Sequence, residues 1–251
     1  MKYGMKSDVG RVRLENQDRV GIFFNKNITL LILCDGMGGH FGGGLASSTT
    51  LNVFDKKFST NFPVDKINDP YVISDWFRST VNSARNEMIK ISHNDEAKLD
   101  MGTTVTATII DKENKIIYVF NIGDSRTYVL TRYGEIKQIT IDHNLYNKLI
   151  AEGVPPVEAK MNRYHAALTS ALGPQKTTKI ELFDVSKHYD EISLFLATSD
   201  GVHDFIDLPI LEQILRSELE PEAKCEELVF EALTNQSTDN CTAGIVVLDN
   251  K

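Results

Sequence analysis

The sequence has no excess of positive charge, and this absence excludes one broad class of function. It contains 27 Lys and Arg residues against 35 Asp and Glu residues, which gives a formal net charge of −8. Proteins that bind nucleic acid normally carry a basic stripe, and no such stripe is visible along this chain. We therefore expect no nucleic-acid partner.

Long apolar runs are also missing, and cysteines are few. No stretch approaches the roughly 18 to 20 apolar residues of a membrane span, and the opening MKYGMKSDVG lacks the apolar centre of a signal peptide. We therefore expect a cytoplasmic protein with no membrane contact. Cys34, Cys225 and Cys241 lie far apart and form no CxxC pair, so we expect reduced core thiols rather than disulfides or zinc ligands.

The 251 residues, 41% of them hydrophobic, are enough for a substantial globular core, and no internal repeat or low-complexity linker divides them. Alternating and continuous apolar patterns predict strands at residues 3–7, 20–25, 28–34, 103–111, 115–122, 126–131, 135–139, 179–185, 192–197 and 242–248. Apolar residues at helical spacing predict helices at 43–58, 70–91, 208–219 and 221–233.

The links between these segments indicate the architecture. The links at 112–114, 123–125 and 132–134 are so short that we expect antiparallel neighbours, since parallel strands need a long crossover. Residues 142–173 differ, because a helical pattern is broken at Gly153 and at Pro155-Pro156, and we interpret this segment as a small flap. Two packed sheets with helices outside fit this order, and a Rossmann alternation does not.

Three aspartates stand beside apolar runs. Asp35 follows residues 28–34, Asp200 follows the run at 192–197, and Asp239 precedes the last strand. A buried carboxylate is costly unless it is paired or binds a cation. Because no matching Lys or Arg accompanies them, these carboxylates suggest a site for a hard metal ion, to which part of the acidic excess would belong.

The loop DGMGGHFGGG, which starts at Asp35, has neither a Walker A ending nor the GxGxxG form. A generic phosphate nest remains open. We favour the alternative that its glycines let the backbone approach a metal, so that a carbonyl such as that of Gly36 serves as a ligand.

Eight stretches, in this order and spacing, resemble the bacterial members of the metal-dependent serine/threonine protein phosphatases, the protein phosphatase 2C-like or PPM family. They are SDVGRVRLENQD from Ser7, CDGMGGHFGGGLAS from Cys34, MGTTVTATII from Met101, NIGDSRTYVL from Asn121, DHN from Asp142, LTSALG from Leu168, LATSDGVHD from Leu196 and STDNCTAGIVV from Ser237. Any one of these motifs is weak, but the ordered set is specific and covers almost the whole chain.

The resemblance implies an α+β fold, a four-layer α-β-β-α sandwich of two mostly antiparallel sheets flanked by helices. It implies a single domain over residues 1–251 that contains the flap at 142–173. It also implies a centre of two Mn²⁺ or Mg²⁺ ions, with a third, weaker ion possible. Asp35 would bridge both ions, the Gly36 carbonyl would bind the first, and Asp200 and Asp239 the second; Asp124, with Asp200, matches the position that helps to bind the third.

Other positions would act around these ligands. The resemblance places Asp18, with Gln17 beside it, where metal-bound waters are held, and Asn240 where it supports Asp239. Arg13 matches the arginine that binds the substrate phosphate, for which a guanidinium fork is better suited than a lysine. Catalysis would thus rest on Arg13, Asp18 and Asp35.

The implied reaction is hydrolysis of phosphoserine and phosphothreonine in proteins, by a hydroxide that bridges two divalent metals and attacks phosphorus in line. The substrates would be those of a eukaryotic-like serine/threonine kinase, and the enzyme a monomer. Two alternatives stay open, a phosphatase dedicated to one partner-switching regulator and a phosphatase-like regulator without catalysis. The intact aspartates and Arg13 speak against the second.

The chain departs from the family pattern at a few positions. Met37 stands where many eukaryotic relatives have a histidine proposed as general acid, and His40 lies three residues further on. Gln17 replaces a glutamate, and Ser170 stands where many bacterial relatives have arginine. We expect Arg126 to form a structural ion pair.

Asp204 either lines the site or caps the next helix. For His143, His165, His188 and His203, which show no ligand spacing, we expect surface or hydrogen-bonding roles.

Overall fold

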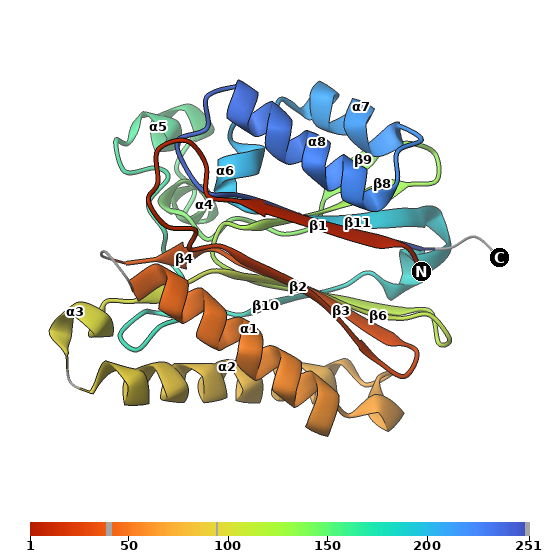
Figure 1. Cartoon of the computed structure of the whole chain (residues 1–251), viewed down its shortest axis with the longest axis horizontal. Coiled ribbons are helices and arrows are strands. Elements are labelled where there is room, and N and C mark those ends of the chain that lie inside the picture. Colours follow the sequence, from red (N-terminus) through yellow and green to blue (C-terminus); the bar gives the residue numbers. More distant parts are fainter. Residues whose placement is uncertain (39–41, 94, 249–251) are drawn as a thin grey trace.

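Two antiparallel sheets pack face to face, and helices cover their outer faces (Figure 1). The computed structural model describes residues 1–38, 42–93 and 95–248. The first sheet has the strand order β1-β12-β11-β8-β9 and the second has the order β10-β7-β6-β3-β2, and neighbouring strands are antiparallel in both. The four-layer α+β sandwich predicted from the sequence is therefore confirmed.

The strand bounds follow the predicted ones closely. The first sheet consists of β1 (Tyr3–Asp8), β12 (Cys241–Val247), β11 (Ile192–Thr198), β8 (Arg126–Thr131) and β9 (Ile136–Gln138). The second consists of β10 (Glu181–Asp184), β7 (Ile116–Ile122), β6 (Val105–Asp111), β3 (Ile28–Cys34) and β2 (Arg19–Asn25). A third pair, β4 (Gly36–Met37) and β5 (Gly102–Thr103), lies beside the start of α1.

Helices cover the two sheets on opposite sides (Figure 1). The second sheet is covered by α1 (Gly42–Asn61) and α2 (Pro70–Ser92), and the first by α6 (Asp200–His203), α7 (Leu208–Arg216) and α8 (Pro221–Thr234). Three further short elements are η1 (Val64–Lys66), α3 (Glu96–Leu99) and η2 (Ser186–Glu191). No helix within the described residues is long and apolar enough to cross a membrane.

Helix α2 begins as its sequence predicts. The Asp69 carboxylate accepts hydrogen bonds from the N–H groups of Tyr71 and Val72, at 3.0 and 3.4 Å, and Pro70 occupies the first position. The apolar face of the helix then packs on the second sheet, where Phe77 stacks on Phe120 with ring centroids 4.0 Å apart. Burying such a ring contributes about 2 kcal/mol, so this layer is a firm support for the strands.

One predicted pairing is wrong. We expected residues 115–122 and 126–131 to be antiparallel neighbours, but β7 belongs to the second sheet and β8 to the first. A short link also suffices to cross between sheets that pack about 10 Å apart, and Gly123, at φ +102°, makes the turn. The crossing places Asp124 at one end of the sandwich. The links at 112–114 and 132–134 do join antiparallel neighbours, as predicted.

The predicted strand at 103–111 is divided at Thr104. The N–H of Thr104 donates to the Asp35 carbonyl at 2.8 Å, and its hydroxyl accepts from the Asp35 N–H at 3.0 Å. These two bonds hold the backbone of Asp35 at the end of β3. The break is caused by a residue far away in the sequence, which explains why the local pattern did not reveal it.

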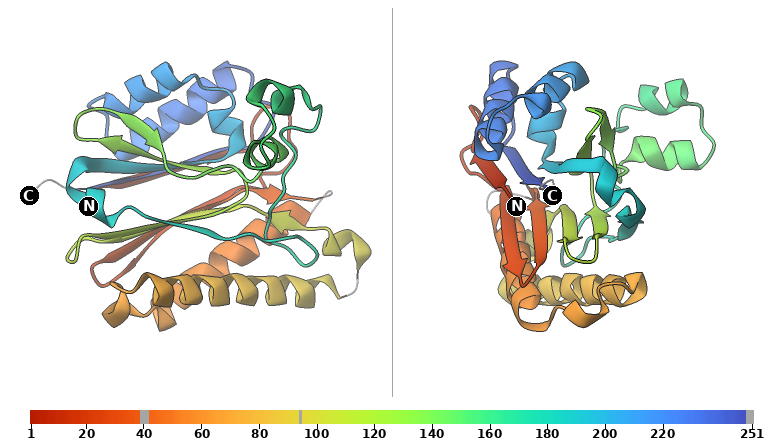
Figure 2. Two further views of the ribbon diagram at one scale, coloured as in Figure 1. Left: turned by 180° about the vertical axis from the view of Figure 1, so that it is seen from behind. Right: turned by 90° about the vertical axis from the view of Figure 1, so that its right-hand side faces the viewer.

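Residues 142–173 contain two short helices, α4 (Leu145–Ala151) and α5 (Pro156–Met161), which pack on each other. Figure 2 shows that they project from the layered body, beside the first sheet. Pro155 and Gly153, with φ +90°, lie in the turn between them. That these residues act as a flap remains a prediction.

Candidate active site

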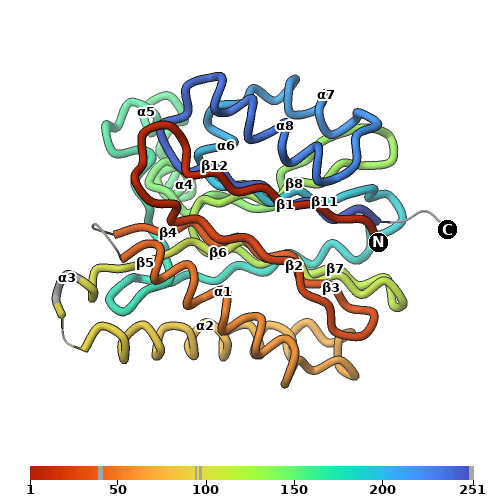
Figure 3. The backbone as a smooth tube through the Cα atoms, in the orientation of Figure 1, coloured from red at the N-terminus to blue at the C-terminus, as the bar shows by residue number. Residues whose placement is uncertain are grey.

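Four carboxylates gather at one end of the sandwich. Asp35 follows β3, Asp124 lies in the crossing between the sheets, Asp200 begins α6, and Asp239 precedes β12. The chain trace in Figure 3 shows β4, α6 and the loop after β1 at this same end. All four line a cavity of about 840 Å³, together with the other predicted site residues Arg13, Gln17, Gly36 and Asn240.

Asp18, the remaining predicted residue, lies buried close to this cavity. Only 3% of its surface is exposed, and its carboxylate accepts a hydrogen bond from the Ser199 hydroxyl at 2.8 Å. Burial, with a smaller effect of Asp200 and Asp239, raises the pKa of Asp18 to about 7. The structure thus brings all of the predicted site residues together.

The carboxylates of the cavity repel one another. Burial and then the charge of Asp18 raise the pKa of Asp35 well above its ordinary value. Burial, followed by neighbouring carboxylates, raises the pKa of Asp200 to about 6 and that of Asp124 to about 7. Such a concentration of negative charge favours binding of a cation.

The donor chemistry fits a hard divalent cation. The cavity offers carboxylate and carbonyl oxygens and no histidine or cysteine, which is the set preferred by Mg²⁺ and Mn²⁺. Within the described residues, no three acidic, histidine or cysteine side chains form a ready-made metal-binding group. A bound Mg²⁺ usually takes only one or two carboxylates and keeps several of its waters.

The backbone at Gly36 is tightly enclosed. A Cβ atom on this residue would lie 2.3 Å from the Gly43 carbonyl oxygen and 2.5 Å from that of Gln17, far below van der Waals contact. Only glycine can therefore bring this segment of the loop so close to its neighbours.

Asn240 organises the loop that carries Arg13. Its side chain accepts from the Gln17 N–H at 2.8 Å and donates to the carbonyls of Val9 and Glu15 at 2.8 and 3.0 Å. Its own N–H donates to the Asp239 carboxylate at 2.8 Å. Asn240 therefore contacts Asp239 and, in addition, fixes the loop over residues 9–17.

Arg13 lies at the mouth of the cavity. Its Nη2 atom donates to the Asp239 carboxylate at 2.6 Å, with 54% of the arginine side chain and 32% of the aspartate side chain exposed. Val12 and Leu14 flank it on the cavity wall, and Leu14 is fully exposed. A guanidinium in this position can reach an anion that enters the cavity.

Some neighbours of the site were missed from the sequence. Ser199 orients Asp18, and Thr104 fixes the backbone of Asp35. Ser199 stands in the SDG motif and Thr104 in the MGTTVTATII stretch, and both were usable signals. His40 lies outside the described residues.

The remaining predictions concern residues beside the site. Asp204 lines an adjoining cavity of about 620 Å³, and Asp207 rather than Asp204 precedes α7. Arg126 forms the expected structural ion pair, with Asp142 at 2.7 Å. Ser170 is buried and its hydroxyl accepts from the Lys179 N–H at 2.9 Å.

The histidines have the expected hydrogen-bonding or surface positions. His143 and His203 are buried and contact Glu181 and Thr198. His165 and His188 lie nearer the surface, where their side chains contact the Asn162 carbonyl and Glu191.

Comparison with known families and proteins gives a consistent result. The family model described as protein phosphatase 2C matches residues 10–240. The protein phosphatase PhpP of Streptococcus pneumoniae is 31% identical over 100% of this chain and 99% of its own length. The serine/threonine phosphatase stp of Listeria monocytogenes is 29% identical over 97% of this chain and 94% of its own length.

Solved structures agree with these relatives. The serine/threonine phosphatase Stp1 from Staphylococcus aureus superposes with a TM-score of 0.84 at 28% identity, covering 100% of this chain and 96% of that one. The S. agalactiae serine/threonine phosphatase gives a TM-score of 0.85 at 27% identity, covering 99% of both chains. The chain therefore belongs to the protein phosphatase 2C family and is a protein serine/threonine phosphatase.

Proposed function

We propose that the chain removes phosphate from phosphoserine and phosphothreonine in proteins, with two Mn²⁺ or Mg²⁺ ions held at its acidic end. The observation that carries this proposal is the cavity where the carboxylates of Asp35, Asp124, Asp200 and Asp239 meet the guanidinium of Arg13. When bound there, two such ions would lower the pKa of a shared water and stabilise negative charge on the phosphoryl group.

Each ligand has a place in this proposal. Asp35 would hold both ions, the Gly36 carbonyl would hold the first, and Asp200 and Asp239 would hold the second. Asp124, together with Asp200, would hold a third ion more weakly. The support is positional, since all of these residues line one cavity and the pKa values of Asp35, Asp124 and Asp200 are raised there.

Asp18, Gln17 and Asn240 support the site without binding the ions directly. The Asp18 carboxylate, fixed by the Ser199 hydroxyl, would hold metal-bound waters, with Gln17 beside it. Asn240 holds Asp239 through its N–H and keeps the Arg13 loop in place.

Arg13 binds the substrate phosphate. Within the part of the chain that the structure describes, Arg13 donates one hydrogen bond, to Asp239, so the rest of its guanidinium fork can pair with phosphate oxygens. Because the positive charge lies at the cavity mouth, it orients the phosphoryl group and stabilises the charge that builds on its oxygens in the transition state.

We propose the following setting for this activity. Residues 1–251 form one domain, in which the flap at 142–173 controls access to the site. The substrates are cytoplasmic proteins phosphorylated by a eukaryotic-like serine/threonine kinase, and the enzyme acts as a monomer. The relatives named serine/threonine phosphatase support the substrate class.

Hydrolysis of a phosphothreonine peptide tests the proposal, measured with Mn²⁺, with Mg²⁺ and with EDTA. We expect turnover that needs the divalent ion and falls about 1000-fold in Asp239→Asn. Asp190→Asn is a matched control, because Asp190 lies in η2 and pairs on the surface with Lys115. A folded wild-type protein without turnover in either ion would refute the proposal and favour a binding role.

A further inference from the structure

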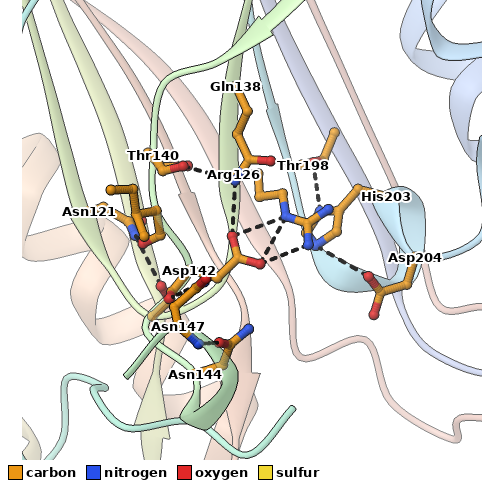
Figure 4. A network of polar contacts seen from close by, with 12 residues as sticks. Asn121, Arg126, Gln138, Thr140, Asp142, Asn144, Asn147, Thr198, His203 and Asp204 are labelled. Atoms are coloured by element: carbon orange, nitrogen blue, oxygen red, sulfur yellow. Dashed lines mark hydrogen bonds and ion pairs between the residues drawn. The ribbon is translucent and has the colours of Figure 1, made fainter. Parts of the chain in front are cut away.

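A network of polar contacts lies beside the carboxylates and has no role in the proposed chemistry (Figure 4). At its centre, Arg126 Nε lies 3.0 Å from Asp142 Oδ1, and Arg126 Nη2 lies 2.7 Å from Asp142 Oδ2. The two side chains are 24% and 7% exposed. Such a bidentate, largely buried ion pair has a fixed geometry.

Asp142 connects this pair to the base of the flap. Its carboxylate also accepts from Gln138 Nε2 at 3.1 Å, and its carbonyl accepts from Asn147 Nδ2 at 2.9 Å. Asn144 then caps α4 by accepting from the Asn147 N–H at 2.9 Å. The first turn of α4 is thus bound to the same residue that holds Arg126.

The same segment holds the crossing loop that carries Asp124. The His143 N–H donates to the Gly123 carbonyl at 2.9 Å, and the Gly123 N–H donates to His143 Nδ1 at 3.2 Å. The Asn121 side chain donates to the Ile141 carbonyl at 3.1 Å. Asp124 therefore lies between two positions, Gly123 and Arg126, that are both bound to the base of the flap.

The network also borders the cavity next to the site. Arg126 and Asp142 line the adjoining cavity together with Tyr146 and Lys160, which come from α4 and α5. Asp124 and Asp200 line both this cavity and the one at Arg13. A polypeptide whose phosphorylated residue lies at Arg13 can therefore extend along Asp124 and Asp200 toward the two helices.

We propose that Arg126 and Asp142 are positioning residues that fix the base of the flap to the loop carrying Asp124. This connection keeps the carboxylate of Asp124 at a fixed distance from a protein substrate that contacts α4 or α5. The inference rests on the proposed function, because it assigns the adjoining cavity to residues of the substrate next to the phosphorylated one.

The test uses Asp142→Asn, which keeps the shape of the side chain and removes its charge. The first readout needs no divalent ion: trypsin cleavage after Lys148, Lys160 and Arg163, followed in EDTA by mass spectrometry. We expect cleavage at these flap sites to become about 10-fold faster. Asp190→Asn, which removes a carboxylate from a surface ion pair at the far end of β7, should cleave like the wild type.

The second readout separates positioning from a merely structural role. For the phosphothreonine peptide, we expect KM to rise about 5-fold in Asp142→Asn, whereas KM for p-nitrophenyl phosphate, which is too small to reach the flap, should change less than about 2-fold. The kcat should fall for both substrates, because Asp124 is displaced. Arg126→Lys, which keeps the charge without the fork, should show the same pattern at smaller size.

Two results would overturn the inference. One is unchanged cleavage of the flap in both variants. The other is faster cleavage with KM and kcat unaltered for both substrates, which would make the pair a simple structural contact. A wild-type protein inactive on both substrates would refute the proposed function, while the cleavage comparison in EDTA would still show whether the pair fixes the flap.

Discussion

Two arginine–aspartate pairs lie near the carboxylates, and they differ in how firmly each arginine is held. Arg126 contacts Asp142 through two nitrogens, and only 7% of that aspartate side chain is exposed. Arg13 contacts Asp239 through one nitrogen, at the surface, with more than half of its own side chain exposed. The same chemical pair thus appears once as a fixed support and once as a contact that can be exchanged for a ligand.

The two pairs differ in the free energy needed to separate them. Separating a buried ion pair leaves an uncompensated charge, so Arg126 stays with Asp142. An exposed pair contributes about 0–1 kcal/mol, and a phosphate with two negative charges can displace the aspartate. We infer that Arg126 positions parts of the site, whereas Arg13 binds the phosphate.

The largest effect should come from breaking the buried pair. Arg126→Met should lower the free energy of unfolding by about 3 kcal/mol, because Asp142 keeps its charge without the partner. Arg13→Met should change it by less than about 0.5 kcal/mol. Urea titration of the two variants measures both values, and equal losses would contradict the distinction between the pairs.

For binding of the substrate phosphate, Arg13 should matter more than Arg126. Arg13→Ala should lower kcat/KM for a phosphothreonine peptide about 100-fold, through the lost fork to the phosphate oxygens. Arg13→Lys should recover part of the loss, since it keeps a point charge. Steady-state kinetics with saturating Mn²⁺ measure this, and a loss below about 3-fold in Arg13→Ala would show that another group binds the phosphate.

A smaller effect concerns the pH dependence of stability that arises from Asp124. The pKa of Asp124 is raised to about 7, whereas it is near 3.8 in an unfolded chain, so the native state binds the extra proton between these values. Stability must therefore fall as pH rises from about 4 to 7. In EDTA, Asp124→Asn should remove this penalty and be more stable than the wild type by about 1–2 kcal/mol at pH 8, but not at pH 4.

Thermal melts across this pH range measure the difference between the two proteins. With Mn²⁺ present, the order at pH 8 should reverse, because the ion binds the native carboxylate. A difference that does not depend on pH in EDTA would contradict the raised pKa of Asp124.

Much of the fold was predictable because its signals are local. The buried strand at residues 28–34 and the capped helix from Pro70 are visible in short windows of sequence, and the structure has both. The crossing at Gly123 was not predictable in this way. A three-residue link joins two strands equally well within one sheet or between two, and only the packing of the sheets decides.

The candidate site was predictable as a set of residues but not as a geometry. Asp35, Asp200 and Asp239 were found because each stands beside an apolar run. The family resemblance supplied Arg13, Asp18 and Asp124. The bonds from Thr104 to Asp35 and from Ser199 to Asp18 join residues far apart in the chain. No spacing in the sequence encodes such contacts, and the same holds for the connection between Arg126 and the flap.

The central claim is that two divalent ions bind among the carboxylates and that Asp35 holds both. Calorimetric titration of the EDTA-treated, dialysed protein with Mn²⁺ tests it most directly, with Asp35→Asn and Asp190→Asn titrated alongside. The account predicts two ions per chain in the wild type and in Asp190→Asn, and loss of both in Asp35→Asn. Binding of a single ion, or two ions retained in Asp35→Asn, would contradict it.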